Sequence, residues 1–370
     1  MDMNSTWPPD NSTVDLPPEL SIFEVFMWHW RTSTLGRTSQ ALHLYAVPAL
    51  IAFGTLGNLL LFMMTSQLAV KYSSFVYVRA YAVLCTAALW LECSVTWLHE
   101  LRPSWQHIEN HAEWTCRLYR FASVLAARAP AWVIVFAVAD RTVFVLSARH
   151  AKSLCTAFAA NVFTLFSFFA VCIISVHLLW LTQLKRDGVS GATFCVETDR
   201  LFIYEHVWFA LINSVLLHAP VALVVTSLIV IAVKVGQLSC SRQAVGGDAQ
   251  WKLVASISLS ATVILTLSLL STCLNILVQV YDVSTLEQQV RVMFFDELSK
   301  LLHCLLWSIN LPLFVATSSL LRHELALQVR SRCCRQVEQT DGNDVTSTNE
   351  AEELMRKRSD TSPTQEVTQV

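Results

Sequence analysis

The stretch CRLYRFASVLAARAPAWVIVFAVADRT, from Cys116 to Thr142, decides the fold class. It is mostly apolar, and it ends in an acid followed by an arginine, Asp140 and Arg141. Twenty-five residues separate Cys116 from Arg141. In one helix, at about 1.5 Å per residue, this distance is roughly 37 Å, close to the thickness of a bilayer with part of its headgroup layer. The stretch therefore predicts a membrane-spanning helix with a cysteine at one face and a charged pair at the other.

Composition extends this expectation to the whole chain. Of its 370 residues, 54% are hydrophobic and 15% are charged, and the mean hydropathy is +0.47. Because a soluble domain carries about 25% charged residues, most of this chain is expected to lie in lipid. The net charge of −2 does not indicate nucleic-acid binding. Residues 1–40 lack the basic and apolar regions of a cleavable signal peptide.

Seven apolar runs are long enough to cross a bilayer. Because each run is continuous and far longer than the roughly ten residues of a barrel strand, the runs predict helices. The predicted fold is all-α, a seven-transmembrane helix bundle over residues 42–318. The runs are 42–66, 74–99, 117–147, 154–183, 205–235, 252–280 and 292–318.

The short loops between the runs predict the orientation. One set of loops carries most of the Lys and Arg, and the other carries most of the Asp and Glu. Basic loops remain in the cytoplasm, so the N-terminus is expected outside a plasma membrane and the C-terminus inside. Asn4 and Asn11 each begin an NST glycosylation sequon, which is usable only on the outer side. Residues 1–41 are therefore expected to form an extracellular segment.

A short amphipathic eighth helix is predicted after the last run, over residues 319–335. Apolar residues recur at every fourth position from Leu321 to Val329, opposite arginines, as in helices that lie on a membrane surface. Cys333 and Cys334 are candidate palmitoylation sites, with two idle thiols as the alternative.

The C-terminal tail, residues 336–370, is polar and is expected to be a disordered cytoplasmic segment. It ends with Thr368 and Val370 at the spacing of a PDZ ligand, whose carboxylate is held by backbone amides. Phosphorylation of hydroxyl residues near the end of the tail would add negative charge for an arrestin-type partner.

Two cysteines fall on the outer side. Cys116 begins the third run, and Cys195 lies in the loop between the fourth and fifth runs. Because the exterior is oxidising, this pair is expected to form a disulfide. Cysteines within the apolar runs, such as Cys93 and Cys304, are interpreted as small buried hydrophobic residues. No spacing of Cys and His suggests a metal site.

The topology, the cysteine pair and the Asp140-Arg141 pair together resemble the rhodopsin-like (class A) G-protein-coupled receptors over residues 42–335. Asn58, Pro220 and Asn310 fall where this family has characteristic residues in its first, fifth and seventh helices. Residues 148–156 are also similar to the second inner loop of invertebrate neuropeptide receptors of the FMRFamide type.

The resemblance implies a role for each matching residue. Arg141 would contact a G protein in the active state, and Asp140 would hold Arg141 at rest. Asn310 opens the segment NLPLF, which ends at Phe314 and is similar to NPxxY with the proline shifted by one position. The implied function is a receptor, with no enzymatic activity and no cofactor, that couples an extracellular ligand, preferably a neuropeptide, to a heterotrimeric G protein.

Several positions depart from the family pattern. Cys85 stands where the second helix usually has an acid, and Pro130 replaces a small polar residue in the third run. Residues 252–280 contain no proline, and Leu228 replaces an inner tyrosine. The usual buried sodium site and the usual sixth-helix switch are therefore not expected.

Polar residues in the outer halves of the runs are the candidates for ligand binding, because ionisable groups at membrane depth are costly. Asp296, Lys300 and His303 share one stripe of the seventh run, and charged groups of this kind suit a peptide. Alternatively, Asp296 and Lys300 only pair with each other, and Arg120 only extends to the surface. Arg79 is interpreted as extending to the inner membrane surface, and Arg128 has no role that the sequence assigns. The full candidate set is Glu92, Arg120, Ser123, Asp296, Lys300 and His303.

Two other classes of function remain as alternatives. A chemosensory receptor for small molecules would have the same fold. A transporter is more distant, because it would require broken helices or internal repeats that the sequence does not show. A membrane hydrolase is disfavoured, because the histidines lack the spacing of a metal-binding motif.

Overall fold

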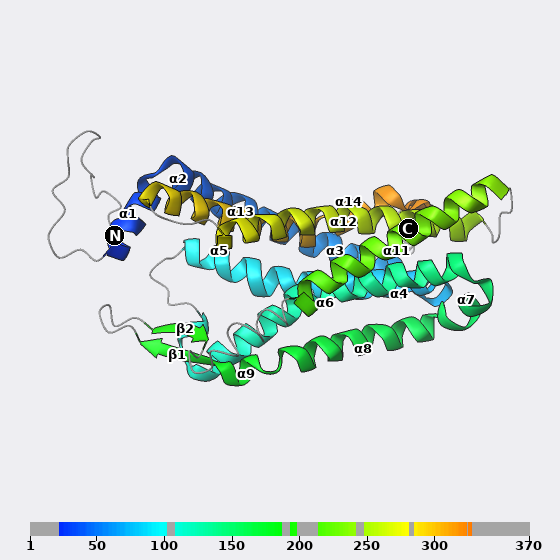
Figure 1. Cartoon of the computed structure of the whole chain (residues 1–370), viewed down its shortest axis with the longest axis horizontal. Helices are drawn as coiled ribbons and strands as arrows, with labels where there is room; N and C mark the ends of the chain where they lie inside the picture. Colours follow the sequence, from blue (N-terminus) through cyan, green and yellow to red (C-terminus); the bar gives the residue numbers. More distant parts are fainter. Residues whose placement is uncertain are drawn as a thin grey trace, which may run out of the picture.

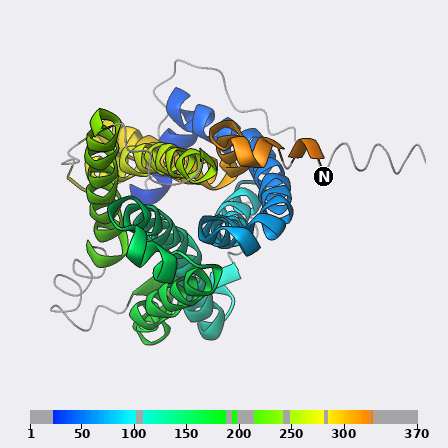
Figure 2. The same ribbon diagram turned by 90° about the vertical axis from the view of Figure 1, so that its right-hand side faces the viewer.

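The computed structural model describes residues 22–101, 108–186, 193–197, 214–241, 248–280, 285–323 and 325–327. Nearly all of these residues are helical, and most helices run along the long axis of the molecule (Figure 1). Seen end-on in Figure 2, the helices form a bundle. The described residues contain one sheet, an antiparallel pair of strands. The chain is therefore an all-α bundle, as the apolar runs predict.

Six helices are long and apolar enough to cross a membrane. The pair α13 (Leu286–Ser308) and α14 (Asn310–Thr317) adds a further candidate only if the two helices, which meet at a 52° bend, are counted as one span. Several spans of this length are typical of a multi-pass membrane protein. The six are Thr34–Lys71, Ser73–Leu98, Glu113–Leu146, Ala157–Leu181, Ala219–Gln237 and Gln250–Val278.

Short helices, turns and the two strands lie before or between the long helices along the chain. Three short segments, η1, η2 and η5, are π-helical turns, and η3 is a 3₁₀ turn. The elements are α1 (Ile22–Thr32), α2 (Thr34–Ala41), η1 (Leu42–Ala46), α3 (Val47–Lys71), α4 (Ser73–Ala88), η2 (Leu89–Cys93), α5 (Ser94–Leu101), η3 (Ile108–Asn110), α6 (Glu113–Leu146), α7 (Ala148–Leu154), α8 (Ala157–Ser175), α9 (Leu178–Leu181), β1 (Thr182–Arg186), β2 (Thr193–Glu197), η5 (Ser214–His218), α11 (Ala219–Ser241) and α12 (Asp248–Val280).

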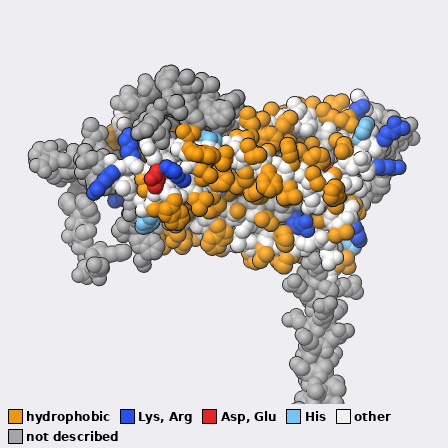
Figure 3. All heavy atoms as spheres, turned by 90° about the horizontal axis from the view of Figure 1, so that it is seen from below, with side chains coloured by type: hydrophobic (Ala, Val, Ile, Leu, Met, Phe, Trp, Pro, Cys, Tyr) orange, Lys and Arg blue, Asp and Glu red, His pale blue; other side chains and the backbone are white. Residues whose placement is uncertain are grey.

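The surface of the bundle is apolar in its middle. Figure 3 shows hydrophobic side chains covering this zone, with Lys and Arg gathered toward the two ends. On α8, Phe158 and Ile173 are 80% and 71% exposed. An apolar zone of this extent would cause a soluble protein to aggregate, and it suits contact with lipid tails.

Helix α6 is the central element of the bundle. It packs against α4, α8, α11 and α12. Its first turn lies at the end of the molecule that carries β1 and β2, and its last turn meets α7 at the other end (Figure 1). We call these the hairpin end and the Arg141 end.

Helical structure begins earlier than the predicted 42–66. Ser33 caps α2, because its Oγ accepts a hydrogen bond from the backbone N–H of Gly36 at 3.0 Å. A Cβ at Gly36 would clash with the carbonyl oxygen of Trp30, so this tight connection between α1 and α2 requires glycine. Helix α2 then continues through η1 into α3 and packs against α13.

The bend between α13 and α14 has a cause in the sequence. Pro312 has no N–H to donate to the carbonyl of Ser308, and its ring crowds that carbonyl. Helix α3 packs closely against this bend. A Cβ on Gly54 would lie 2.8 Å from Cα of Ser308, and one on Gly57 would lie 3.2 Å from Cβ of Leu311. The two glycines therefore allow α3 to approach the break.

Candidate functional site

A disulfide closes the hairpin end of the bundle. Cys116, in the first turn of α6, is bonded to Cys195 on β2, with 5.5 Å between the Cα atoms. Cys195 lies opposite Leu184 in the hairpin, and its backbone N–H donates to Oδ1 of Asn110 at 2.8 Å. These two links fix the hairpin at the top of α6. The bonded pair is the one that the sequence analysis proposed.

A cavity of about 310 Å³ lies within the bundle, toward the hairpin end. It brings together residues of η1, α3, η2, α5, α6, α12 and α13. Asp296 is the one predicted ligand residue that does not line it, and its carboxylate is paired with Nζ of Lys300 at 2.8 Å. The predicted residues that do line the cavity are Glu92, Arg120, Ser123, Lys300 and His303.

Two π-helical turns direct polar side chains toward this cavity. A π turn holds one residue more than an α turn, so it changes which side chains face the bundle. Turn η1 carries His43, and turn η2 carries Glu92 and Cys93. His43 is not among the residues predicted from the sequence, because it lies at the edge of the first apolar run with no recognisable partner nearby in sequence. Nε2 of His43 lies 2.8 Å from Oε2 of Glu297.

Most charged groups of the cavity wall have partners. The Ser123 hydroxyl donates to the carboxylate of Glu92. Arg120 lies 3.8 Å from Glu109. Nζ of Lys300 lies 2.8 Å from Glu297 as well as from Asp296. Arg120 and Lys300 are therefore neutralised by acids, as expected for ionisable groups at membrane depth, whereas Glu92 is bonded to a neutral hydroxyl.

His303 connects α13 to α12. Its Nδ1 lies 2.9 Å from the hydroxyl of Ser271 and 3.0 Å from the carbonyl oxygen of Ser299. The hydroxyls of Ser271 and Ser299 are 2.8 Å apart, and both residues are buried. This polar group joins the two helices beside the cavity, which His303 and Thr272 both line.

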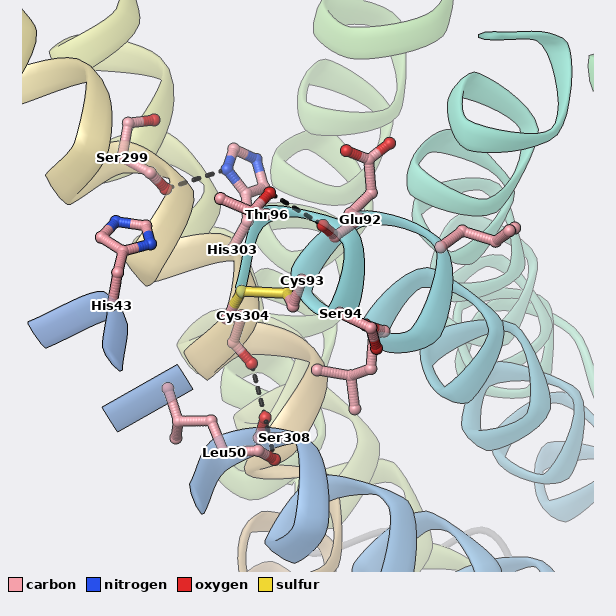
Figure 4. The surroundings of a disulfide bond; sticks show 12 residues. His43, Leu50, Glu92, Cys93, Ser94, Thr96, Ser299, His303, Cys304 and Ser308 are labelled. Atoms are coloured by element: carbon pink, nitrogen blue, oxygen red, sulfur yellow. Dashed lines mark hydrogen bonds between the residues drawn. A yellow bond between two sulfur atoms is a disulfide. The ribbon is translucent and has the colours of Figure 1, made fainter. Parts of the chain in front are cut away.

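A second disulfide joins Cys93 of η2 to Cys304 of α13, with 6.2 Å between the Cα atoms (Figure 4). The interpretation of these two cysteines as simple buried hydrophobic residues is therefore wrong. The two lie 211 residues apart in separate apolar runs, so spacing alone could not pair them. Both line the cavity, next in sequence to Glu92 and His303. The bond fixes two walls of the cavity to each other.

Below the cavity, two asparagines meet at the bend between α13 and α14. Nδ2 of Asn310 donates to Oδ1 of Asn58 at 2.8 Å. Both amides also donate to the carbonyl oxygen of Trp307, each at 3.1 Å. The buried ring of Phe314 packs edge-on against Tyr81, with 6.4 Å between centroids. The residues that the family resemblance singled out thus tie α3 to the seventh apolar segment.

Pro220 is buried at the start of α11, directly after η5. Its missing N–H and its ring disfavour a regular α turn before it. Cys85 and Pro130 are also buried, Pro130 within α6. Helix α12 has no break between Asp248 and Val280, as its lack of proline allows.

The Arg141 end contains a buried polar cluster. Oδ2 of Asp140 accepts hydrogen bonds from Nε of Arg141 and from the hydroxyl of Ser73, both at 2.9 Å. Nη2 of Arg141 also donates to Ser73 at 3.0 Å, and Nη1 donates to Oε1 of Gln250 at 3.1 Å. Arg141 is only 2% exposed. It therefore joins α6 to α4 and α12 while its own charge is balanced by Asp140.

Aromatic contacts and one thiol complete this cluster. The guanidinium of Arg141 lies 5.5 Å from the ring centroid of Phe144, which packs edge-on against Trp251 at 6.2 Å. Sγ of Cys155 donates to the backbone carbonyl of Asp140 at 3.2 Å. Burial, and secondly the charge of Asp140, raise the pKa of the Cys155 thiol to about 12. The thiol is therefore protonated at neutral pH.

Several predicted sites lie outside the described residues. They are Asn4, Asn11, Cys333, Cys334, Thr368 and Val370.

Of the predicted eighth helix, residues 319–323 and 325–327 are helical. Nη1 of Arg322 there donates to the carbonyl oxygen of Val315 at 2.9 Å, at the end of α14. Within the described ranges, no three His, Cys, Asp or Glu side chains are arranged to hold a metal ion.

No known protein family matches the sequence, and no curated protein matches it.

Proposed function

We propose that this chain is a rhodopsin-like G-protein-coupled receptor that crosses the plasma membrane seven times. In this proposal α13 and α14 together make the seventh span, and the hairpin end is extracellular. The excess of Lys and Arg in the loops of the Arg141 end supports that orientation. The helical residues after α14 would be the start of a short helix on the inner leaflet.

The observation that carries the proposal is that one helix bears both sites. Helix α6 contributes Arg120 and Ser123 to the cavity at one end and buries Arg141 in a polar cluster at the other. A transporter would place its polar groups along a path through the bundle. Two polar sites at opposite ends of shared helices suit a protein that passes a signal across the membrane.

Helix α12 offers a route between the two sites. Thr272 lines the cavity, and Gln250 of the same unbroken helix accepts a hydrogen bond from Arg141. A ligand that pulls or pushes the outer part of α12 would therefore change the stability of the Arg141–Gln250 contact. In this mechanism the ligand shifts the population from a closed inner face to an open one. Arg141 would then be free to contact a heterotrimeric G protein.

The ligand that we favour is a neuropeptide. The cavity presents both signs of charge together with hydroxyl and imidazole groups, which suit the backbone and termini of a peptide. The tail and its C-terminal Val370 would serve arrestin and PDZ partners. A small-molecule receptor of the same fold is the second candidate, since about 310 Å³ lies at the lower end of the range for small-molecule pockets.

The proposal is tested by removing the charge that holds Arg141. Asp140→Asn keeps the shape of the side chain and loses its negative charge, so the closed cluster should weaken and basal G-protein activation should rise several-fold. The measurement is G-protein dissociation in transfected cells at equal surface expression, with Glu287→Gln at the exposed start of α13 as the control. The proposal is wrong if Asp140→Asn leaves both basal and ligand-evoked G-protein activation unchanged.

A further inference from the structure

Arg128 stands apart from the other charged residues of the cavity. It lies on α6, five residues beyond Ser123, and it lines the cavity. Arg120 and Lys300 each have a carboxylate within 4 Å. Arg128 has no ion pair or hydrogen bond with any residue that the structure describes. Glu92, which also lines the cavity, is the opposite charge that acts on Arg128, and no ion pair joins the two residues.

The position of Arg128 is deep. It lies twelve residues beyond Cys116, or about 18 Å along the helix, whereas Glu92 meets α6 at Ser123, about 10 Å along it. Arg128 and His303 line both the main cavity and a smaller one of about 60 Å³. Ala127 and Trp307 also line both cavities, so these four residues together form the boundary between them. A ligand that enters from the hairpin end would meet Glu92 first and Arg128 last.

A guanidinium without an anionic partner is costly at membrane depth, because an ionised group is less well solvated there than in bulk water. Its planar fork of N–H donors matches the two oxygens of a carboxylate. Glu92 is already bonded to Ser123 and belongs to a different level of the cavity. The site can therefore still bind one anion at Arg128, deep in the cavity. It can also bind one hydrogen-bond donor or cation at Glu92.

We propose that the ligand inserts a free carboxylate that pairs with Arg128, while an amine or other donor of the same ligand pairs with Glu92. This inference rests on the proposed receptor function and narrows its ligand. A cavity of about 310 Å³ admits only the end of a peptide, and the C-terminal end is the one whose main chain carries a carboxylate, so the inference places a free C-terminus there. A small amino acid carries the same two groups.

The test uses purified full-length protein in nanodiscs and three sets of probes. Two tripeptide libraries have identical sequences and end in either a free carboxylate or a carboxamide, and a third set contains small amino acids. Binding is measured as the rise in Tm with probe concentration. The free-acid probes should bind, and their carboxamide counterparts should bind about 30-fold more weakly or worse, the loss expected when one partner of a desolvated charge pair is removed.

Variants of Arg128 test whether this residue causes the stronger binding of the free acids. Arg128→Gln should abolish the preference for the free acid. Arg128→Lys, which keeps the charge without the fork, should reduce it. Arg117→Gln is the matched control on the same helix, since Arg117 pairs with Glu113 outside the cavity and should leave the preference intact. A rise in Tm with the free-acid tripeptides would identify a peptide C-terminus as the source of the carboxylate. A rise with the small amino acids alone would identify a small amino acid as the source.

Three results would overturn the inference. They are equal binding of acids and carboxamides, a preference that survives Arg128→Gln, and no binding of any free-acid probe. If one of these results is found while Asp140→Asn still raises G-protein activation, the carboxylate site is wrong and the receptor function stands. If Asp140→Asn has no effect either, both proposals fail.

Discussion

Nη1 of Arg141 on α6 donates a hydrogen bond of 3.1 Å to Oε1 of Gln250 on α12, across 109 residues of sequence. Because Arg141 is also bonded to Asp140 and to Ser73 of α4, one guanidinium holds three helices together at this end of the bundle. Arg141 is almost fully buried, so no large partner can reach it in this conformation. The structure therefore represents a conformation in which the Arg141 end is closed.

The Gln250 contact should set the basal activity. Gln250→Ala removes a hydrogen bond to a charged group, worth about 1.5–3 kcal/mol, and should raise basal G-protein activation several-fold. Gln250→Glu should lower basal activation, because a carboxylate binds Arg141 more strongly. Gln237→Ala, an exposed glutamine of α11, is the control. If Gln250→Ala and Gln250→Glu change basal activation in the same direction, the Arg141–Gln250 contact does not hold the Arg141 end closed.

Close packing at Gly54 should be essential for stability. A Cβ there would lie 2.7 Å from Leu89 and 2.8 Å from the backbone of Ser308, so Gly54→Ala should destabilise the protein by about 1–3 kcal/mol. Gly236→Ala is a matched control, because a Cβ at Gly236 would meet nothing within 4 Å. That control should be neutral or slightly stabilising, since alanine favours a helix. Thermal unfolding in detergent measures both, and equal Tm values would contradict the packing argument.

The Cys93–Cys304 bond should contribute to stability independently of the Cys116–Cys195 bond. A bond that closes so long a loop typically contributes about 2–4 kcal/mol, so the double variant Cys93→Ser, Cys304→Ser should lower the Tm. Cys172→Ser, which removes a free cysteine of α8, is the control. Peptide mapping without reductant checks the bond directly. Recovery of Cys93 and Cys304 as free thiols would show that the bond does not form.

The raised pKa of Cys155 predicts slow alkylation. With a pKa near 12, the reactive thiolate is about 0.01% of the population at pH 8, against roughly a quarter for an ordinary thiol. Maleimide labelling should therefore be slow at pH 8 and should accelerate as the pH approaches 12. Asp140→Asn removes the second cause of the shift and should speed labelling at pH 8. Mass spectrometry measures the rate, and a folded protein that labels as fast as denatured protein would refute the shift.

Much of the bundle follows from local properties of the sequence. The length of the apolar runs predicts the long helices, and the location of Cys116 and Cys195 outside those runs predicts a bond between them. Pro312 in the seventh run is a local signal for the bend at Ser308, although no bend was among the predictions. The helices and the bend each depend on a single segment of the sequence. The Cys116–Cys195 bond depends only on both cysteines lying outside the apolar runs.

Other features depend on contacts between distant segments and could not be predicted in this way. The π turn at η2 aligns Cys93 with Cys304, and no periodic pattern reveals such a turn. Arg128 had no role in the sequence analysis, because its significance depends on which acids lie near it in the bundle. The contact of Arg141 with Gln250 likewise depends on how α12 packs against α6.

The most direct measurement is nucleotide exchange on a purified G protein by the purified chain in nanodiscs. Three forms are compared at equal concentration: the unaltered chain, Asp140→Asn, and Asp140→Asn combined with Arg141→Ala. The account predicts faster exchange with Asp140→Asn and a return to the uncatalysed rate when Arg141 is also removed. Equal rates for all three forms, or fast exchange that persists without Arg141, would contradict it.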